Sequence, residues 1–180
     1  MRPRCSVYIA VSLDGFIARR DGRIDWLSAV AREGEDYGYA RFIGSVDTLV
    51  LGRKTYDTAL GFGDWPYAGK RCVVITNASN LSAKHDESFF SGSPDALVER
   101  LTSAGAKRVY VDGGNVIRQF LAAGLVDDVT LSIIPVLLGE GVPLFGSTGR
   151  DIGLELVTSR SFASGLVQVE YRIAPPAAPS

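Results

Sequence analysis

The chain has 180 residues, 46% of them hydrophobic, and its 19 basic and 20 acidic residues leave a net charge of −1. This composition predicts a single domain with its own core over residues 1–173, and the balanced charge argues against a nucleic-acid partner. No apolar run reaches the roughly 18 residues of a membrane span, and no cleavage pattern follows the N-terminal arginines, so a cytoplasmic protein is expected. Two cysteines and one histidine are too few for a disulfide framework or a multi-histidine metal site, so no metal is expected.

The N-terminal segment alternates between strand-like and turn-like stretches. Cys5–Val11 is apolar and predicts a strand, and Asp14-Gly15 marks a turn before a second extended segment, Phe16–Ala18. A polar loop follows, and Trp26 is expected to plug the core beneath it.

Glu33–Ile43 has the pattern of a helix in which Asp36, Ala40 and Ile43 share one face. A carboxylate on an otherwise apolar face is costly unless it is partnered or functional, which makes Asp36 a candidate functional residue. The alternative is that Asp36 lies near the start of the helix and only complements the helix dipole.

A strand–glycine–helix junction comes next. The apolar strand Asp47–Leu51 runs directly into Gly52–Thr55, of sequence GRKT, and a helix begins near Tyr56. Arginine, lysine and threonine side chains all suit a phosphate group, so the junction is a candidate phosphate site, although the P-loop pattern is absent. The alternative is a solvated helix start with Thr55 as its cap.

Two further segments have clear patterns. Arg71–Thr76 predicts a buried strand that ends at Thr76 and Asn77, whose side chains suit either a ligand or a turn. Ser93-Pro94 has the cap-then-proline pattern of a helix start.

Val109–Leu138 contains a strand, a glycine turn, a helix and a second strand. Asp112-Gly113-Gly114 breaks the first strand, and Gly124 suits the left-handed end of the helix. A helix N-terminus after a glycine turn offers backbone N–H groups and a favourable dipole to an anion. Asp112 is interpreted as a turn residue rather than a catalytic acid.

Strands alternate with helices over the first 130 or so residues, and Leu154–Ser161 and Gly165–Ile173 predict an antiparallel pair before a disordered tail, 174–180. We therefore expect a three-layer α/β fold: a mostly parallel central sheet, helices on both faces and an antiparallel C-terminal edge pair. Ligands of such sheets bind at the carboxyl ends of strands, so both glycine junctions can face one crevice.

Two anion-binding junctions on one crevice fit an extended, doubly phosphorylated ligand such as a dinucleotide. The G-x-G-x-x-G fingerprint of ordinary dinucleotide folds is missing. The positive charge of Arg53 and Lys54 suits NADPH more than NADH.

The combination of motifs resembles the dihydrofolate reductase-like superfamily. More narrowly, it resembles the C-terminal reductase domain of the bacterial bifunctional riboflavin-biosynthesis deaminase-reductase, here as a stand-alone member. The resemblance implies NADPH as cofactor and a homodimer, which the apolar edge segment Val136–Leu138 also suggests. It extends from about Val7 to Ile173 and rests on VYIAVSLDGFIA, EDYGYARF, VLGRKTY, VVITN, VDGGNVIRQFL and GLVDDVTLSIIPVLLGEGVPLF.

The resemblance also implies site residues at matching positions. It assigns Ala10, Ile17 and Ala18 to the nicotinamide and places Asp36 and Glu140 beside the substrate. The phosphates would contact Gly52, Arg53, Lys54 and Thr55. The pyrophosphate would pack against Gly113, Gly114, Asn115 and Val116. The adenosine end would lie beside Thr76 and Asn77.

The leading hypothesis is thus an NADPH-dependent reductase that transfers hydride to a nitrogen heterocycle, either similar to 5-amino-6-(5-phosphoribosylamino)uracil or a pterin. Asp36 would bind an amino or ring N–H group or assist protonation. A non-catalytic nucleotide-binding or sensor module on the same fold is a second hypothesis, and a reductase using another reduced cofactor, such as a deazaflavin, is a third.

Overall fold

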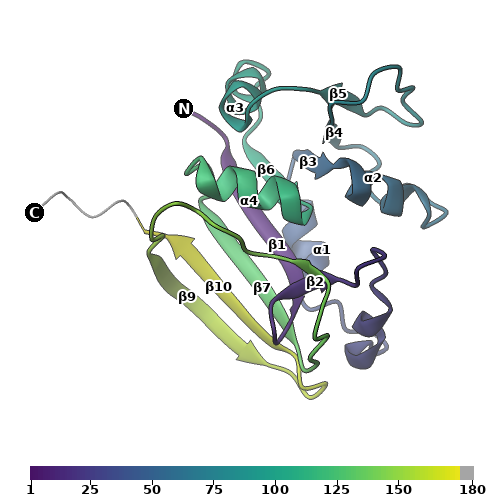
Figure 1. The fold of residues 1–180 in the computed structure, drawn as a ribbon, viewed down its shortest axis with the longest axis vertical. Coiled ribbons are helices and arrows are strands. Elements are labelled where there is room, and N and C mark those ends of the chain that lie inside the picture. Colours follow the sequence, from purple (N-terminus) through teal and green to yellow (C-terminus); the bar gives the residue numbers. More distant parts are fainter. Residues whose placement is uncertain (175–180) are drawn as a thin grey trace, which may run out of the picture.

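A central sheet organises the molecule (Figure 1). In the computed structural model, which describes residues 1–174, eight strands form this sheet in the order β5-β4-β3-β6-β1-β7-β10-β9. All neighbouring strands run parallel except at β7–β10 and β10–β9, which are antiparallel. The strands are β1 (Arg4–Ser12), β3 (Thr48–Gly52), β4 (Arg71–Ile75), β5 (Ser88–Phe90), β6 (Arg108–Asp112), β7 (Asp128–Ile134), β9 (Leu154–Ser161) and β10 (Val167–Ile173).

Helices cover both faces of the sheet, as the three-layer prediction requires. On one face, α3 (Pro94–Ser103) and α4 (Gly114–Ala122) pack against β1, β6 and β7 in the largest core cluster. On the other face, α1 (Tyr39–Gly44) and α2 (Arg53–Leu60) form a second cluster with β3, β4 and Tyr110. The predicted fold class is confirmed.

Strand β3 shows why the sequence predicted a parallel, doubly covered sheet. Val50 faces the α3–α4 cluster, whereas Leu49 and Leu51 face the α1–α2 cluster, and all three are fully buried. A strand buried on both faces needs an unbroken apolar run, which Leu49–Leu51 supplies.

The segment around Asp36 is a turn rather than the first half of the predicted helix. The structure begins α1 only at Tyr39, so the first half of the predicted helix Glu33–Ile43 is wrong. Gly34 and Gly38 have φ of 76° and 88°, and Tyr37 has φ of 56°, so the backbone there is left-handed and cannot continue a helix. A 3₁₀ helix, η1 (Asp25–Val30), was not predicted, but its Trp26 is buried in the core as expected.

The predicted start of the helix at Ser93 and the predicted left-handed Gly124 are both confirmed. Ser93 caps α3 by accepting a hydrogen bond from the Ala96 N–H at 3.3 Å, and Gly124 is left-handed, with φ of 68°, just after α4. The predicted tail 174–180 falls almost wholly on residues 175–180, which lie outside the described residues.

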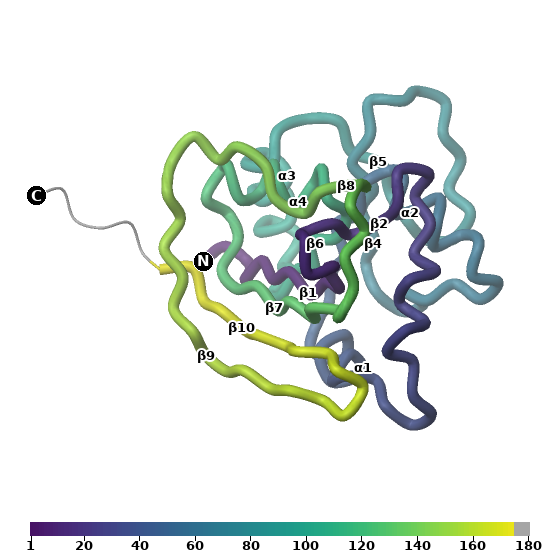
Figure 2. The backbone as a smooth tube through the Cα atoms, turned by 60° about the horizontal axis from the view of Figure 1, so that its bottom comes forward, coloured from purple at the N-terminus to yellow at the C-terminus, as the bar shows by residue number. Residues whose placement is uncertain are grey.

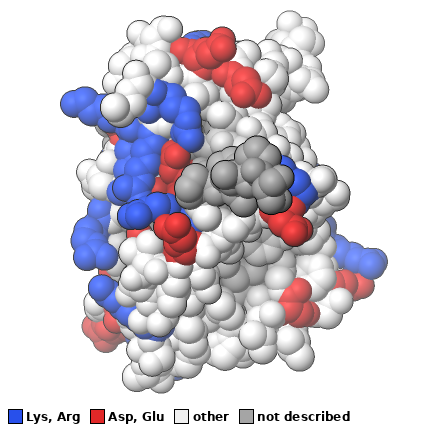
Figure 3. Space-filling model, turned by 90° about the vertical axis from the view of Figure 1, so that its left-hand side faces the viewer, with Lys and Arg blue, Asp and Glu red and all other residues white. Residues whose placement is uncertain are grey.

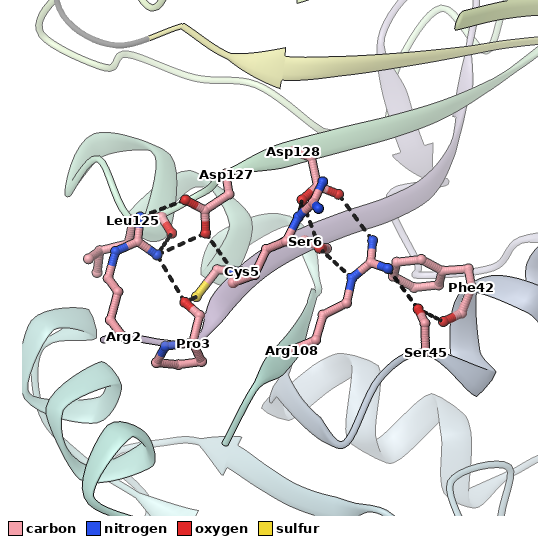
Figure 4. Close-up of polar contacts among 11 residues, drawn as sticks. Arg2, Pro3, Cys5, Ser6, Phe42, Ser45, Arg108, Leu125, Asp127 and Asp128 are labelled. Carbon is pink, nitrogen blue, oxygen red and sulfur yellow. Dashed lines mark hydrogen bonds and ion pairs between the residues drawn. The ribbon is translucent and has the colours of Figure 1, made fainter. Parts of the chain in front are cut away.

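An ion network joins the amino ends of the central strands (Figure 4). The buried Asp128 carboxylate accepts from Arg4 Nε at 2.5 Å, Ser6 Oγ at 2.9 Å and Arg108 Nη2 at 3.4 Å. Arg108 also donates to Ser45 Oγ at 2.7 Å and lies over the Phe42 ring. The start of β7 is thereby tied to β1, β6 and α1, at the end of the sheet opposite to the cavity described below.

The surface that carries the N-terminus has a band of Lys and Arg side chains with acidic side chains among them (Figure 3). Within residues 1–174, no helix is both long and apolar enough to span a bilayer.

Candidate active site

A cavity of about 910 Å³ opens at the carboxyl ends of the parallel strands. Gly52 ends β3, Ile75 ends β4 and Asp112 ends β6, and all three line it. The volume lies near the top of the range of about 300–1,000 Å³ for ligand pockets, so the cavity is large enough for an extended ligand.

The two glycine junctions meet at this cavity, as the sequence predicted. Gly113 has φ of 103°, and a Cβ on it would lie 2.6 Å from Thr55 Oγ1 and 3.3 Å from the Gly52 nitrogen. The backbone approach therefore requires glycine. Neither α2, capped by Gly52, nor α4, capped by Gly113, has a side-chain cap, so Thr55 does not cap its helix. Two helix starts thus present backbone N–H groups at one place.

Three cationic side chains line this part of the cavity, which we call the cationic end: Arg53, Lys54 and Arg118. Arg53 Nε is paired with Asp57 at 2.8 Å along α2, and Arg118 donates to the Pro143 carbonyl. Arg118 was missed by the sequence analysis. The sequence could have indicated Arg118, because it lies four residues after Gly114 and therefore on the same face of the predicted helix.

A short strand pair covers the glycine junction. β2 (Phe16–Ala18) pairs with β8 (Val142–Pro143), and Ile17 Cδ1 lies 2.8 Å from where a Gly114 Cβ would be. Ile17, Ala18 and Ala10 all line the cavity. Ile17 thus lies next to the junction between β6 and α4, whereas Ala10 packs against the cluster of Trp26 and Ile134 on another part of the same cavity wall.

The other part of the cavity, which we call the aromatic end, is lined mainly by apolar and tyrosine side chains. η1 contributes Leu27 and Val30, and β7 contributes Ser132 and Ile134. The tyrosines that line the cavity are Tyr8, Tyr37, Tyr39, Tyr67 and Tyr110. Flat rings with hydroxyl groups suit a planar heterocycle that needs both stacking and hydrogen bonds.

Asp36 lines the cavity from the turn before α1. Its two carboxylate oxygens accept from the Ala40 N–H at 2.9 Å and the Gly38 N–H at 2.8 Å. These backbone hydrogen bonds hold the pKa of Asp36 below its ordinary value. Asp36 is therefore a carboxylate at neutral pH, suited to accept hydrogen bonds rather than to donate a proton.

Asp112 has the opposite character. Burial raises the pKa of Asp112 to about 6, against the opposing effect of the Gly113 N–H, which donates to it at 2.8 Å. A half-buried carboxyl that titrates close to neutral pH and lines a cavity is a candidate for proton exchange. The interpretation of Asp112 as only a turn residue missed this property.

Three of the predicted site residues do not line the cavity. Thr76 Oγ1 accepts from the Ala78 N–H, and Asn77 Oδ1 accepts from Ser91 Oγ, just beyond β4. Glu140 is exposed and pairs with Arg20 at 2.9 Å. Within residues 1–174, no three His, Cys, Asp or Glu side chains are grouped as metal ligands would be.

This architecture is the dihydrofolate reductase-like fold. The deaminase/5-amino-6-(5-phosphoribosylamino)uracil reductase of Thermotoga maritima has it, with a TM-score of 0.73 over 96% of this chain and 57% of that chain, at 17% identity. At such low identity the likeness shows the fold alone.

The chain belongs to the RibD C-terminal domain family, whose pattern matches residues 3–168. It is 35% identical over 173 residues to the uncharacterized protein YwjB of Bacillus subtilis, covering 95% of this chain and 98% of that one. A Shewanella sp. PV-4 protein provisionally assigned to riboflavin biosynthesis has a TM-score of 0.90 and 33% identity, with 97% and 100% of the two chains covered.

Proposed function

We propose that this protein is an NADPH-dependent reductase that transfers hydride to a nitrogen heterocycle of the aminouracil or pterin kind. The observation that carries the proposal is one cavity with two chemically different ends. Two uncapped helix starts and three cations form one end, and tyrosines with a carboxylate form the other. Membership of a reductase family supports the same reaction class.

The cationic end fits a dinucleotide phosphate. Because Gly113 has no Cβ, Thr55 and Gly52 pack directly against it, and the two helix starts lie close enough together for one ligand to contact both. Gly52, Lys54, Thr55 and the segment Gly113–Val116 would hold the phosphates, with Arg53 as a bidentate partner. Thr76 and Asn77 directly follow Ile75, which lines the cavity, and we keep them for the adenosine end.

Hydride transfer would take place between the two ends of the cavity. When bound, NADPH supplies a hydride. Ala10, Ile17 and Ala18 would pack against its ring and exclude water. Asp36 would accept a hydrogen bond from an amino or ring N–H group of the substrate, with Glu140 at the rim.

Proton exchange with the substrate is the proposed role of Asp112. A group with a pKa near the working pH is the most effective general acid or base, and the pKa of Asp112 is about 6. This moves the protonation role from Asp36 to Asp112 and leaves Asp36 as a binding residue.

A homodimer in the cytoplasm is part of the proposal. β9 lies at the edge of the sheet and exposes Leu154, Leu156 and Val157 by half or more of their surface. Exposed apolar side chains on an edge strand favour contact with another copy.

Measuring turnover distinguishes the proposed enzyme from a module that only binds the cofactor. NADPH oxidation, followed at its absorbance band with pterin and aminouracil acceptors, should depend on the acceptor. Asp36→Asn should lower kcat/KM at least tenfold and leave the NADPH dissociation constant within about twofold. NADPH binding with no oxidation by any acceptor would instead support the module.

A further inference from the structure

Gln168, on the C-terminal strand β10, gathers three distant parts of the chain around one side-chain nitrogen. Its Nε2 lies 2.9 Å from Tyr8 Oη, 3.0 Å from the Tyr37 carbonyl oxygen and 3.0 Å from Ser132 Oγ. Tyr8, Tyr37 and Ser132 line the cavity, whereas Gln168 does not. The residue therefore lies directly behind the aromatic end.

The orientation of this amide follows from its partners. A backbone carbonyl only accepts hydrogen bonds, so the NH₂ group of Gln168, and not its oxygen, must face Tyr37. The Tyr8 hydroxyl donates to the same carbonyl at 2.6 Å and accepts from Gln168. Strand register supports the arrangement, because Gln168 pairs with Ser132 and Ser132 pairs with Ala10.

Tyr37 is the residue that most needs such support. Its φ of 56° is a left-handed conformation that a bulky residue rarely adopts. Its hydroxyl donates to the Val30 carbonyl and lies 2.9 Å from Ser164 Oγ, and its ring packs edge-on against Phe162. Figure 2 shows β10 lying between β7 and β9. Phe162, Ser164 and Gln168 of the β9–β10 hairpin therefore hold Tyr37, and with it the turn that carries Asp36.

We propose that Gln168 is a positioning residue for the substrate end of the site. One N–H of Gln168 fixes the Tyr37 carbonyl, and with it the turn that directs Asp36 into the cavity. The other N–H is shared between the Tyr8 and Ser132 hydroxyl oxygens and so influences the direction of both hydroxyls. Specificity for the ring at the aromatic end is therefore set partly from β10. The proposal rests on the proposed function for the identity of the ligands, but its structural part does not.

The first test measures the turn itself, in the ligand-free protein, by NMR order parameters of backbone amides. In the wild type, residues 36–40 should have order parameters near 0.85, typical of rigid backbone. In Gln168→Leu they should fall below about 0.6, while those of β6 stay unchanged. Unchanged values at residues 36–40 in Gln168→Leu would overturn the proposal.

Two further variants separate positioning from simple filling of space. Gln168→Glu keeps the size but places a carboxylate against the Tyr37 carbonyl, so it should loosen the turn as Gln168→Leu does. If Gln168→Leu does not fold, Tyr8→Phe tests the same link by removing one hydroxyl. Gln119→Leu, at the other glutamine of the chain, half-buried on α4, is the matched control and should leave the turn rigid.

The second test uses ligands. With pterin as the probe, Gln168→Leu should raise the dissociation constant at least tenfold and leave that of NADPH within about twofold. An equal loss for both ligands would show general destabilisation and overturn the proposal. If the wild type binds neither ligand, the proposed function fails, and the NMR test alone decides the role of Gln168.

Discussion

At the scale of single residues, Asp112 is the side chain of the cavity whose pKa differs most from its ordinary value toward neutral pH. Burial raises the pKa of Tyr39, Tyr67 and Tyr110, and the charge of the neighbouring Asp112 raises each further. A carboxyl kept in such a place costs the folded state free energy whenever it is ionised. Carboxyl groups with raised pKa values cluster at functional sites.

Replacing Asp112 should therefore stabilise the protein in a pH-dependent way. The folded-state pKa of about 6 exceeds the ordinary 3.8, so the folded protein loses stability as pH rises through this window and does not regain it above. Asp112→Asn should raise the free energy of unfolding at pH 7.5 by on the order of 2 kcal/mol and change it little at pH 4.

Urea unfolding of both proteins at the two pH values checks this expectation. An equal change at pH 4 and pH 7.5 would show that the carboxyl does not carry the effect. Acceptor-dependent NADPH oxidation should fall in the same variant, so that stability and activity change in opposite directions.

At the scale of elements, the site depends on the close approach of α2 and α4. Gly113→Ala must move Thr55, and Gly113 has a positive φ that alanine resists. We expect about 2 kcal/mol of lost stability and at least tenfold weaker NADPH binding. Thermal unfolding and a binding titration measure the two effects. Gly44→Ala, in α1 with no neighbour near its Cβ position, is the control and should lose neither.

Elements were predictable from the sequence where local signals decide them. The apolar run of β3, the Ser93 cap and Gly124 all act within a few residues of their positions. The turn at Gly34–Gly38 was not predictable, because the left-handed Tyr37 is held by Gln168, 131 residues away. For the same reason the pKa of Asp112 could not be foreseen: its surroundings come from separate segments of the chain.

At the scale of the whole molecule, one end of the sheet carries a structural ion network and the other end carries the cavity. The network around Asp128 joins the amino ends of the strands, and the cavity lies at their carboxyl ends. β9 lies at a third place, the lateral edge, where Leu156 is 58% exposed. This separation lets an interface form without covering the cationic end.

Light scattering after size exclusion tests the proposed homodimer. The wild type should have twice the mass of the 19.3 kDa chain. Leu156→Lys should shift it toward a monomer, because it places a charge in the apolar contact. Leu137→Lys tests whether the segment after Pro135 contributes as well. A wild type that stays monomeric at high concentration would rule the dimer out.

The dissociation constant of NADPH is the measurement that tests the central claim most directly. Fluorescence titration of the wild type should show saturable binding, tighter than for NADH or a reduced deazaflavin, because Arg53, Lys54 and Arg118 line the cationic end. Arg53→Ala should weaken it at least tenfold, and Arg160→Ala on β9 should not. Absence of saturable binding at millimolar NADPH would contradict the account.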